Sequence, residues 1–451
     1  MRRREQRTDQ TMTADILSLA GPTMLEQLLQ TAVQYLDTAM VGALGTAATA
    51  AVGVTTTVNW LVSGTISALG VGFLSYVAKA LGAGEKDRAR RASAQAVFMV
   101  LLVGCLATAL TLSLAGFIPG WMQADPAIRD RAERYFFILY TPMLPRTATI
   151  LFGTLLRAAG DTKTPMRVGI LVNAVNVVLN FFFIYPTRRV GEIVLPGAGL
   201  GVEGAALASA IAFTVGGLCI TVAFLRHPII SPRGQSLRPA REVLAPCLRV
   251  AVPNMFQRFG TSLGYVAFAA MINSLGEVST AAHTIANTVE SAFYIPGYGM
   301  QMATATLAGN CVGAGDRDRL RRMTRAALRL EVAMMAVTGG LLFLFAPQMM
   351  GIFSREGEVI ALGATVLRMV ALSEPVFGVA IVLEGILQGE GRTGLPFLFN
   401  ILCMWGVRIL GTLICVKGLG LGLVSAWACM ICHNIVLCGL FLWTKLREHK
   451  A

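Results

Sequence analysis

The amino-acid sequence contains an internal repeat, and the spacing between matching positions of its two copies is constant. Pro22 recurs as Pro253 and Pro165 recurs as Pro396, each pair 231 residues apart. The glycine-rich turn at 82–84 recurs with the same spacing at 313–315. A register that holds over so long a span leaves no net insertion between the halves, so we expect two structurally equivalent lobes.

The composition indicates an integral membrane protein rather than a set of soluble domains. Of the 451 residues, 55% are hydrophobic and only 14% are charged. A helix needs roughly 20 mainly apolar residues to span a bilayer, and twelve such stretches are predicted. Their approximate ranges are 14–42, 47–80, 92–117, 134–157, 166–186, 198–225, 243–272, 278–311, 323–348, 362–388, 396–416 and 419–444.

The distribution of basic residues predicts the orientation of the chain. Most of the 38 Lys and Arg residues fall at the termini and in the loops after even-numbered helices, so both termini are expected on the cytoplasmic side of the plasma (inner) membrane. The basic start at residues 2–4 is not followed by a short apolar core, and we expect no cleaved signal peptide. The net charge of +13 then reflects contact with anionic lipid headgroups, and nucleic acid is not an expected partner.

An even number of helices in each half makes the halves parallel repeats, related by an axis along the membrane normal. The expected fold is therefore all-α, with two six-helix lobes around a central cavity. The predicted segments are a cytoplasmic N-terminal segment (1–13), an N-lobe (14–225), a cytoplasmic linker (226–242), a C-lobe (243–444) and a cytoplasmic tail (445–451).

Asp37, in the first predicted helix, is the leading candidate for a functional charge. A charged group near the bilayer centre costs roughly 2.5 to 3.5 kcal/mol on insertion scales, so it should face a partner or a water-filled cavity. The residue equivalent to Asp37 in the second half is Phe268. Because an acid with a purely architectural role would more plausibly occur in both lobes, Asp37 is expected to bind and release a coupling ion.

The fifth predicted helix carries three amides, Asn173, Asn176 and Asn180. The last two are four residues apart and share one helical face. Amide oxygens accept a hydrogen bond from a protonated acid or bind a hard cation. We therefore group Asn176 and Asn180 with Asp37 as a cation-coupling site that would hold Na⁺ if the protein is sodium-coupled; the alternative is interhelical hydrogen bonding.

Other polar residues are candidates for a substrate cavity or for structural roles. Gln34 lies three residues before Asp37 on nearly the same face, and Asn173 lies one turn from Asn176; both are assigned to the cavity. Glu26 follows Pro22 by four residues, and its equivalent Gln257 follows Pro253 by the same distance. A polar group kept at both places is interpreted as structural.

In the second lobe, the eighth predicted helix has a polar and aromatic face that includes Glu290, Tyr294 and Tyr298. Such a face suits contacts with cationic or aromatic substrates. The alternative for Glu290 is a buried ion pair with Arg258 or Arg408. The remaining candidates lie on the tenth helix: Glu374, which could instead pair with Arg368, and Glu384.

The sequence shows no grouping of the kind that catalysis or a cofactor requires. The nine Cys residues lie mostly within apolar spans, and the four His residues are scattered. The repeated Gly-Ala-Gly turns lack the strand and the Gly-Lys-Ser/Thr of a phosphate-binding loop. We expect a protein that is not an enzyme and has no cofactor besides a coupling ion, H⁺ or Na⁺.

At this point the residues resemble the multidrug and toxic compound extrusion (MATE) family, in its NorM-like form. The match includes Asp37-Thr38, the 41–45 stretch, the turn at 81–84 and the second-half stretches at 275–276 and 281–283, and its most specific part is the Leu-Arg-x-x-Gly-Asp-Thr-Lys-x-Pro motif at 156–165. The resemblance implies a twelve-helix exporter driven by an inward Na⁺ or H⁺ gradient, with the family's embedded acid at Asp37. NorM-like members also tend to carry acids in helices 7 and 10, where this chain has Gln257 or Thr261, and Phe377.

The resulting hypothesis is secondary active antiport, by alternating access, of amphipathic and often cationic drug-like compounds by a functional monomer in the lipid bilayer. The first alternative is a lipid or lipid-linked oligosaccharide flippase of related architecture. The second is a major-facilitator-type porter, which the absence of a long central cytoplasmic loop disfavours.

Overall fold

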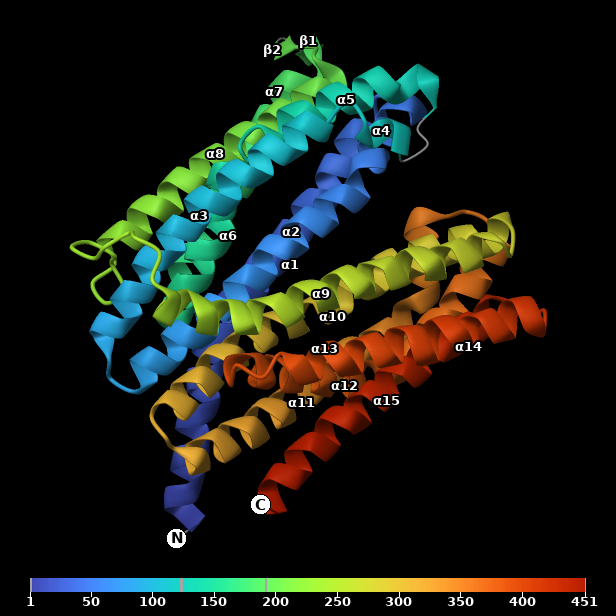
Figure 1. The fold of residues 1–451 in the computed structure, drawn as a ribbon. Helices are drawn as coiled ribbons and strands as arrows, with labels where there is room; N and C mark the ends of the chain where they lie inside the picture. Colours follow the sequence, from blue (N-terminus) through green and yellow to red (C-terminus); the bar gives the residue numbers. More distant parts are fainter. Residues whose placement is uncertain (1, 122–124, 191–192, 451) are drawn as a thin grey trace. The chain divides into compact units, whose positions relative to one another are not determined.

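The computed structural model describes residues 2–121, 125–190 and 193–450, and the chain is almost entirely helical in these ranges (Figure 1). The elements of the first half are α1 (Arg2–Gly42), α2 (Thr46–Gly82), α3 (Lys86–Leu114), α4 (Ile118–Trp121), α5 (Pro126–Tyr140), α6 (Met143–Ala158), α7 (Lys163–Ile184), β1 (Pro186–Val190), β2 (Ile193–Ala198) and α8 (Gly201–Arg226). The elements of the second half are α9 (Arg241–Asn273), α10 (Glu277–Gly313), α11 (Arg317–Phe353), α12 (Gly357–Gly389), α13 (Gly394–Ile401), η1 (Leu402–Ile409), α14 (Leu410–Thr412), η2 (Leu413–Gly418) and α15 (Leu423–Lys450).

Each predicted span coincides with helical structure, although two are interrupted. The fourth span begins in α5 and continues in α6, because the chain turns at Thr141-Pro142 between them. The eleventh is a composite of α13, η1, α14 and η2, two of which are π-helices. Among the described residues, eight helices are long and apolar enough to cross a membrane by length and composition alone.

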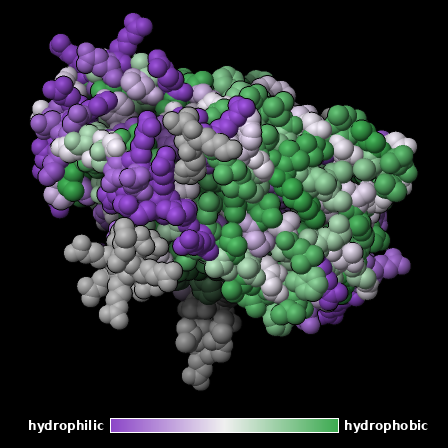
Figure 2. Space-filling view, turned by 90° about the horizontal axis from the view of Figure 1, so that it is seen from below, coloured by the Kyte–Doolittle hydropathy of each residue, from purple (hydrophilic) through white to green (hydrophobic). Residues whose placement is uncertain are grey.

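The outer surface is hydrophobic over wide areas, as expected for helices that face lipid. Figure 2 shows hydrophobic residues across much of one face of the molecule. Large apolar side chains stand exposed on several spanning helices; they include Leu106, Leu218, Val337, Leu344 and Leu372. In water such a surface would cause the molecules to associate with one another, whereas in a bilayer it contacts lipid chains that are equally apolar.

The chain divides into two compact units. Unit 1 contains residues 1–24, 82–84 and 249–451, and unit 2 contains residues 25–81 and 85–248. The first part of α1 thus belongs to the unit that also contains the second repeat. The predicted lobe boundaries, with an N-lobe from residue 14, stay a prediction.

Unit 2 holds the first repeat, apart from the start of α1. In its core, Phe136 and Tyr140 of α5 stack with ring centroids 4.1 Å apart, and Phe152 of α6 stacks on Phe224 of α8 at 4.3 Å. Between α7 and α8, β1 and β2 form an antiparallel hairpin that pairs Pro186 with Ala198. This hairpin lies between the fifth and sixth predicted spans, 166–186 and 198–225.

Unit 1 packs α10, α11 and α12 closely together, with α15 against α12. One of its cores joins Phe268 of α9, Leu342 of α11 and Trp427 of α15, all of them buried. The repeat is visible in the turns as well, because Gly84 and Gly315 both have positive φ, 78° and 67°. Glycine adopts this conformation without the steric cost that other residues incur.

Two adjacent glycines of α11 provide a test of this packing. A Cβ at Gly339 would lie 2.6 Å from the carbonyl oxygen of Ala371 in α12, whereas a Cβ at Gly340 would meet nothing within 4 Å. We expect Gly339→Ala to lower stability by about 1 to 3 kcal/mol, because the helices must separate. Gly340→Ala should be neutral or slightly stabilising. Thermal unfolding in detergent compares the two, and equal midpoints would contradict this packing.

Candidate functional site

The structure brings Asp37, Asn176 and Asn180 together within unit 2. Asn180 Nδ2 of α7 donates to Asp37 Oδ1 of α1 at 2.5 Å. Asn180 and Asn176 are buried, with 1% and 6% of their surfaces exposed. Their spacing of four residues places both amides on the face of α7 that meets Asp37. An acid and two amides, the groups expected from the sequence, therefore share one site.

The hydrogen-bonding groups around Asn176 fit its amide in either of two orientations, because the amide oxygen and nitrogen have nearly the same shape. In one, its oxygen accepts from Asn180 Nδ2 at 3.2 Å, and its nitrogen donates to Ser209 Oγ of α8 at 3.0 Å. In the other, which satisfies its neighbours better, its nitrogen donates to Asp37 Oδ1 at 2.8 Å and Oδ2 at 3.1 Å while its oxygen accepts from Ser209. A hydroxyl group both donates and accepts, so Ser209 suits either orientation.

Sequence reasoning missed Ser209. A single serine in an apolar helix is common, and nothing in its spacing distinguishes it from the other small residues of α8. Its role depends on the rotation of α8 about its axis, which only the packing of α7 against α8 determines.

The other residues that we assigned to the cavity of the first lobe lie outside this hydrogen-bonded group. Gln34 is exposed and Asn173 is half-buried. Within the described ranges, neither side chain donates to or accepts from Asp37, Asn176 or Asn180. Their assignment to a substrate cavity stays a prediction.

In unit 1, the predicted aromatic face of α10 is present. The ring of Tyr294 makes edge-to-face contacts with Tyr298, at 5.9 Å between centroids, and with Phe377 of α12, at 5.7 Å. Glu290, one turn before Tyr294, is buried with 5% exposed. His283, which precedes Glu290 by seven residues on the same helix, is half-buried and accepts a hydrogen bond from Trp427 Nε1 at 3.2 Å.

The alternative ion pairs proposed from the sequence do not form. Arg408 lies over the rings of Phe268 and Tyr265, at 4.2 and 4.8 Å from the centroids, and the described residues give Glu290 no ion pair with Arg408 or Arg258. Arg368 donates to the carbonyl oxygen of Phe343 at 3.4 Å and not to Glu374. Aromatic rings and a backbone carbonyl thus replace the expected carboxylates.

Two acids of unit 1 are buried with no hydrogen-bond partner in the described part of the chain. Glu374 of α12 is 1% exposed and Glu331 of α11 is 0% exposed, and none of their four carboxyl oxygens has a hydrogen bond to a described residue. An unpaired buried charge is costly, so both groups are best accommodated as neutral acids. Sequence reasoning missed Glu331, although an acid within an apolar span is a signal that could have found it.

Glu384 contrasts with these two acids. Its Oε1 accepts from Gln257 Nε2 at 2.8 Å and from Gln388 Nε2 at 2.9 Å. The repeat equivalents of Gln257 and Gln388 are Glu26 and Arg157, which form an ion pair in unit 2 with two contacts of 2.7 Å. The two repeats therefore keep a polar link at the same place with different chemistry, which supports the structural role expected for Glu26.

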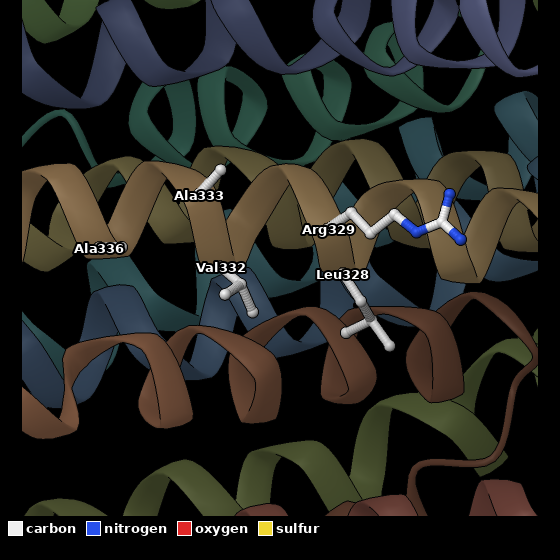
Figure 3. Close-up of a pocket in the computed structure, with 5 residues that line it drawn as sticks. All are labelled: Leu328, Arg329, Val332, Ala333 and Ala336. Carbon is white, nitrogen blue, oxygen red and sulfur yellow. The ribbon is translucent and has the colours of Figure 1, made fainter.

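A pocket on α11 is unrelated to these groups. Figure 3 shows it lined by Leu328, Arg329, Val332, Ala333 and Ala336, all of which come from this one helix. Residues at such spacings form a single stripe along a helix. The pocket is a depression on that helix surface and contains none of the candidate site residues.

The described residues contain no cluster of three or more His, Cys, Asp or Glu side chains arranged for a metal ion. At Asp37, a carboxylate lies beside two amides whose oxygen atoms could face a monovalent cation if the amides turned over. Bound to that group, a cation would be held by Asp37, Asn176 and Asn180.

Comparisons with known proteins agree with the repeat and the fold. The MatE family model matches the chain twice, over residues 22–182 and 253–414. A relative from Thermotoga maritima described as "Probable multidrug resistance protein NorM" is 28% identical over 93% of this chain and 89% of its own length. That description and the names of other relatives do not favour the flippase alternative.

Solved structures have the same fold. A crystal structure of a MATE protein in complex with MaL6 has a TM-score of 0.90 at 23% identity, covering 97% of this chain and 96% of that chain. A structure described as the outward-facing conformation of a multidrug resistance MATE family transporter has a TM-score of 0.89 at 24% identity, with the same coverage. These likenesses confirm the predicted all-α membrane fold of twelve helices in two parallel repeats. With two repeat-spaced matches that together cover more than half of its residues, the chain belongs to the MatE family of multidrug efflux transporters.

Proposed function

We propose that the protein is a cation-coupled antiporter that exports amphipathic organic compounds and that Asp37 is its coupling residue. The observation that carries the proposal is the hydrogen-bonded group of Asp37, Asn176 and Asn180, which occurs in one repeat only. The relative named above is described as a probable multidrug resistance protein, which supports drug-like substrates.

The two amides can form hydrogen bonds with Asp37 in both its ionised and its neutral form. An ionised Asp37 accepts N–H donors from both Asn side chains, whereas a neutral Asp37 donates its own O–H to an amide oxygen. The Asn176 amide can turn either its nitrogen or its oxygen toward Asp37, because the Ser209 hydroxyl can donate to the amide oxygen or accept from the amide nitrogen. A Na⁺ ion would likewise need the amide oxygens turned toward Asp37. Either ion neutralises the carboxylate, which lowers the cost of shielding it from water.

Alternating access then requires that neutral and ionised Asp37 favour different states of the protein. A ligand shifts a conformational equilibrium only by its differential affinity for the two states. Ion binding at Asp37 from one side of the membrane and its release on the other would supply that difference. The site needs no covalent chemistry, in keeping with a family of transporters.

The test is efflux of ethidium from proteoliposomes that contain the purified protein. A Na⁺ gradient is imposed at fixed pH, and a pH gradient is imposed without Na⁺. We expect one of the two gradients to drive the dye uphill, which also identifies the ion. Dye movement that is the same with and without either gradient would refute antiport.

A further inference from the structure

Arg146 of α6 is a buried cation whose guanidinium group is only partly satisfied. Its Nη2 donates to Asn59 Oδ1 at 2.6 Å and to Ser63 Oγ at 2.7 Å, both on α2. The residue is 8% exposed, and its Nη1 is buried without a hydrogen-bond acceptor. A charged donor left in this condition costs more free energy than an ordinary unsatisfied polar group, because the hydration that it lost is not replaced.

Among the residues that the structure describes, no acid compensates the charge of Arg146. Its guanidinium carbon lies 4.8 Å from the centroid of Phe213 in α8 and 5.8 Å from that of Tyr140 in α5. The titratable groups within electrostatic range are Tyr140 and Tyr135, and among the described residues no carboxylate forms an ion pair with it. Aromatic faces stabilise a cation in part but leave its charge uncompensated.

The second repeat has different side chains at the positions equivalent to Arg146 and its two hydrogen-bond partners. The equivalents of Asn59, Ser63 and Arg146 in unit 1 are Glu290, Tyr294 and Phe377, one equivalent for each residue. There the second and third members are also in contact, through the Tyr294 and Phe377 rings. The same place therefore carries an acid with aromatic rings in one unit and an unpaired guanidinium in the other.

From this reversal we infer that Arg146 is a substrate-binding residue that recognises the carboxylate group of anionic or zwitterionic substrates through Nη1. The inference rests on the proposed export function and adds a substrate class to it. The unpartnered N–H of Nη1 supplies a charge-assisted hydrogen bond, and the flanking rings of Phe213 and Tyr140 suit a planar, aromatic acid. Since Nη1 is shielded from solvent in this structure, the substrate must reach it in another state of the transport cycle.

The test uses two dyes that differ only at the acid, tetramethylrhodamine and its methyl ester. Their binding to the purified protein is measured by fluorescence anisotropy in a low-salt buffer that contains neither chloride nor carboxylate ions. We expect the wild type to prefer the free acid, and Arg146→Gln to weaken binding of the acid about tenfold or more while leaving binding of the ester unchanged. Arg146→Lys should restore part of the preference, because it keeps the charge but not the planar donor geometry.

Arg408→Gln is the matched control, because Arg408 is a buried arginine of the other unit that is also flanked by rings. It should leave the difference between acid and ester as in the wild type. Each variant is checked for an unchanged elution profile and melting temperature, and Ser63→Ala provides a milder change that keeps Arg146 itself.

Three results would overturn the inference: no preference of the wild type for the acid, an equal loss of both dyes in Arg146→Gln, or the same loss in Arg408→Gln. Chloride, titrated into this buffer, separates a substrate site from a halide site. Chloride that raises the melting temperature while the two dyes bind alike would assign Arg146 to a structural anion instead. Failure of gradient-driven ethidium efflux would refute the proposed function without affecting these binding results.

Discussion

Asp37→Asn should reduce gradient-driven dye efflux at least about tenfold, a difference of ~1.4 kcal/mol or more. Asparagine has nearly the same size as aspartate and can still accept from Asn180 Nδ2, which now donates to Asp37 at 2.5 Å. It cannot release a proton or balance the charge of Na⁺. The variant should therefore fold and bind dye but lose its response to the imposed gradient, as measured by efflux from proteoliposomes.

Two further variants make this result specific. Asp15→Asn removes an exposed acid of the same helix and should retain coupling. Asn180→Asp keeps the coupling acid but places a second carboxyl group beside it, so that the pH or Na⁺ dependence of efflux should shift. If dye efflux by Asp37→Asn still responded fully to the imposed gradient, Asp37 would not be the coupling residue.

Arg157→Met should destabilise unit 2 by about 3 to 5 kcal/mol, the usual cost of removing one partner of a buried ion pair. Arg157 Nη2 contacts both carboxyl oxygens of Glu26 at 2.7 Å, and the two side chains are 12% and 16% exposed. Without the guanidinium group, Glu26 is left as an unpaired charge between α1 and α6. The midpoint of thermal unfolding in detergent measures the loss.

The second repeat suggests a compensating variant. Gln257 and Gln388 stand at the equivalent places, so Glu26→Gln combined with Arg157→Gln removes both charges at once. We expect this double variant to recover a large part of the stability, because no charge remains buried and unpaired. A double variant as unstable as Arg157→Met would show that the loss comes from packing and not from the stranded carboxylate.

The hydrogen-bonded group of Asp37, Asn176 and Asn180 consists of residues that could be identified from the sequence. An acid within an apolar helix and two amides four residues apart are local signals in the sequence. In the structure, the Asp37 side chain of α1 and the Asn180 side chain of α7 are in contact. The same reasoning failed for Arg368, whose predicted partner Glu374 was chosen by charge and helical face alone. Arg368 instead donates to the carbonyl oxygen of Phe343, and helix spacing gives no information about such neighbours.

The amino-acid sequence by itself determined that this is a membrane protein built from two parallel repeats, because hydropathy and a constant spacing are properties of the linear chain. It also singled out Asp37, Asn176 and Asn180, because their asymmetry between the repeats can be read without coordinates. The tertiary structure alone decided that Ser209 completes that group, that Glu26 pairs with Arg157 and that no acid of the described ranges lies beside Arg146. These contacts join helices distant in sequence, and they depend on how far each helix is rotated about its axis when it packs against its neighbours.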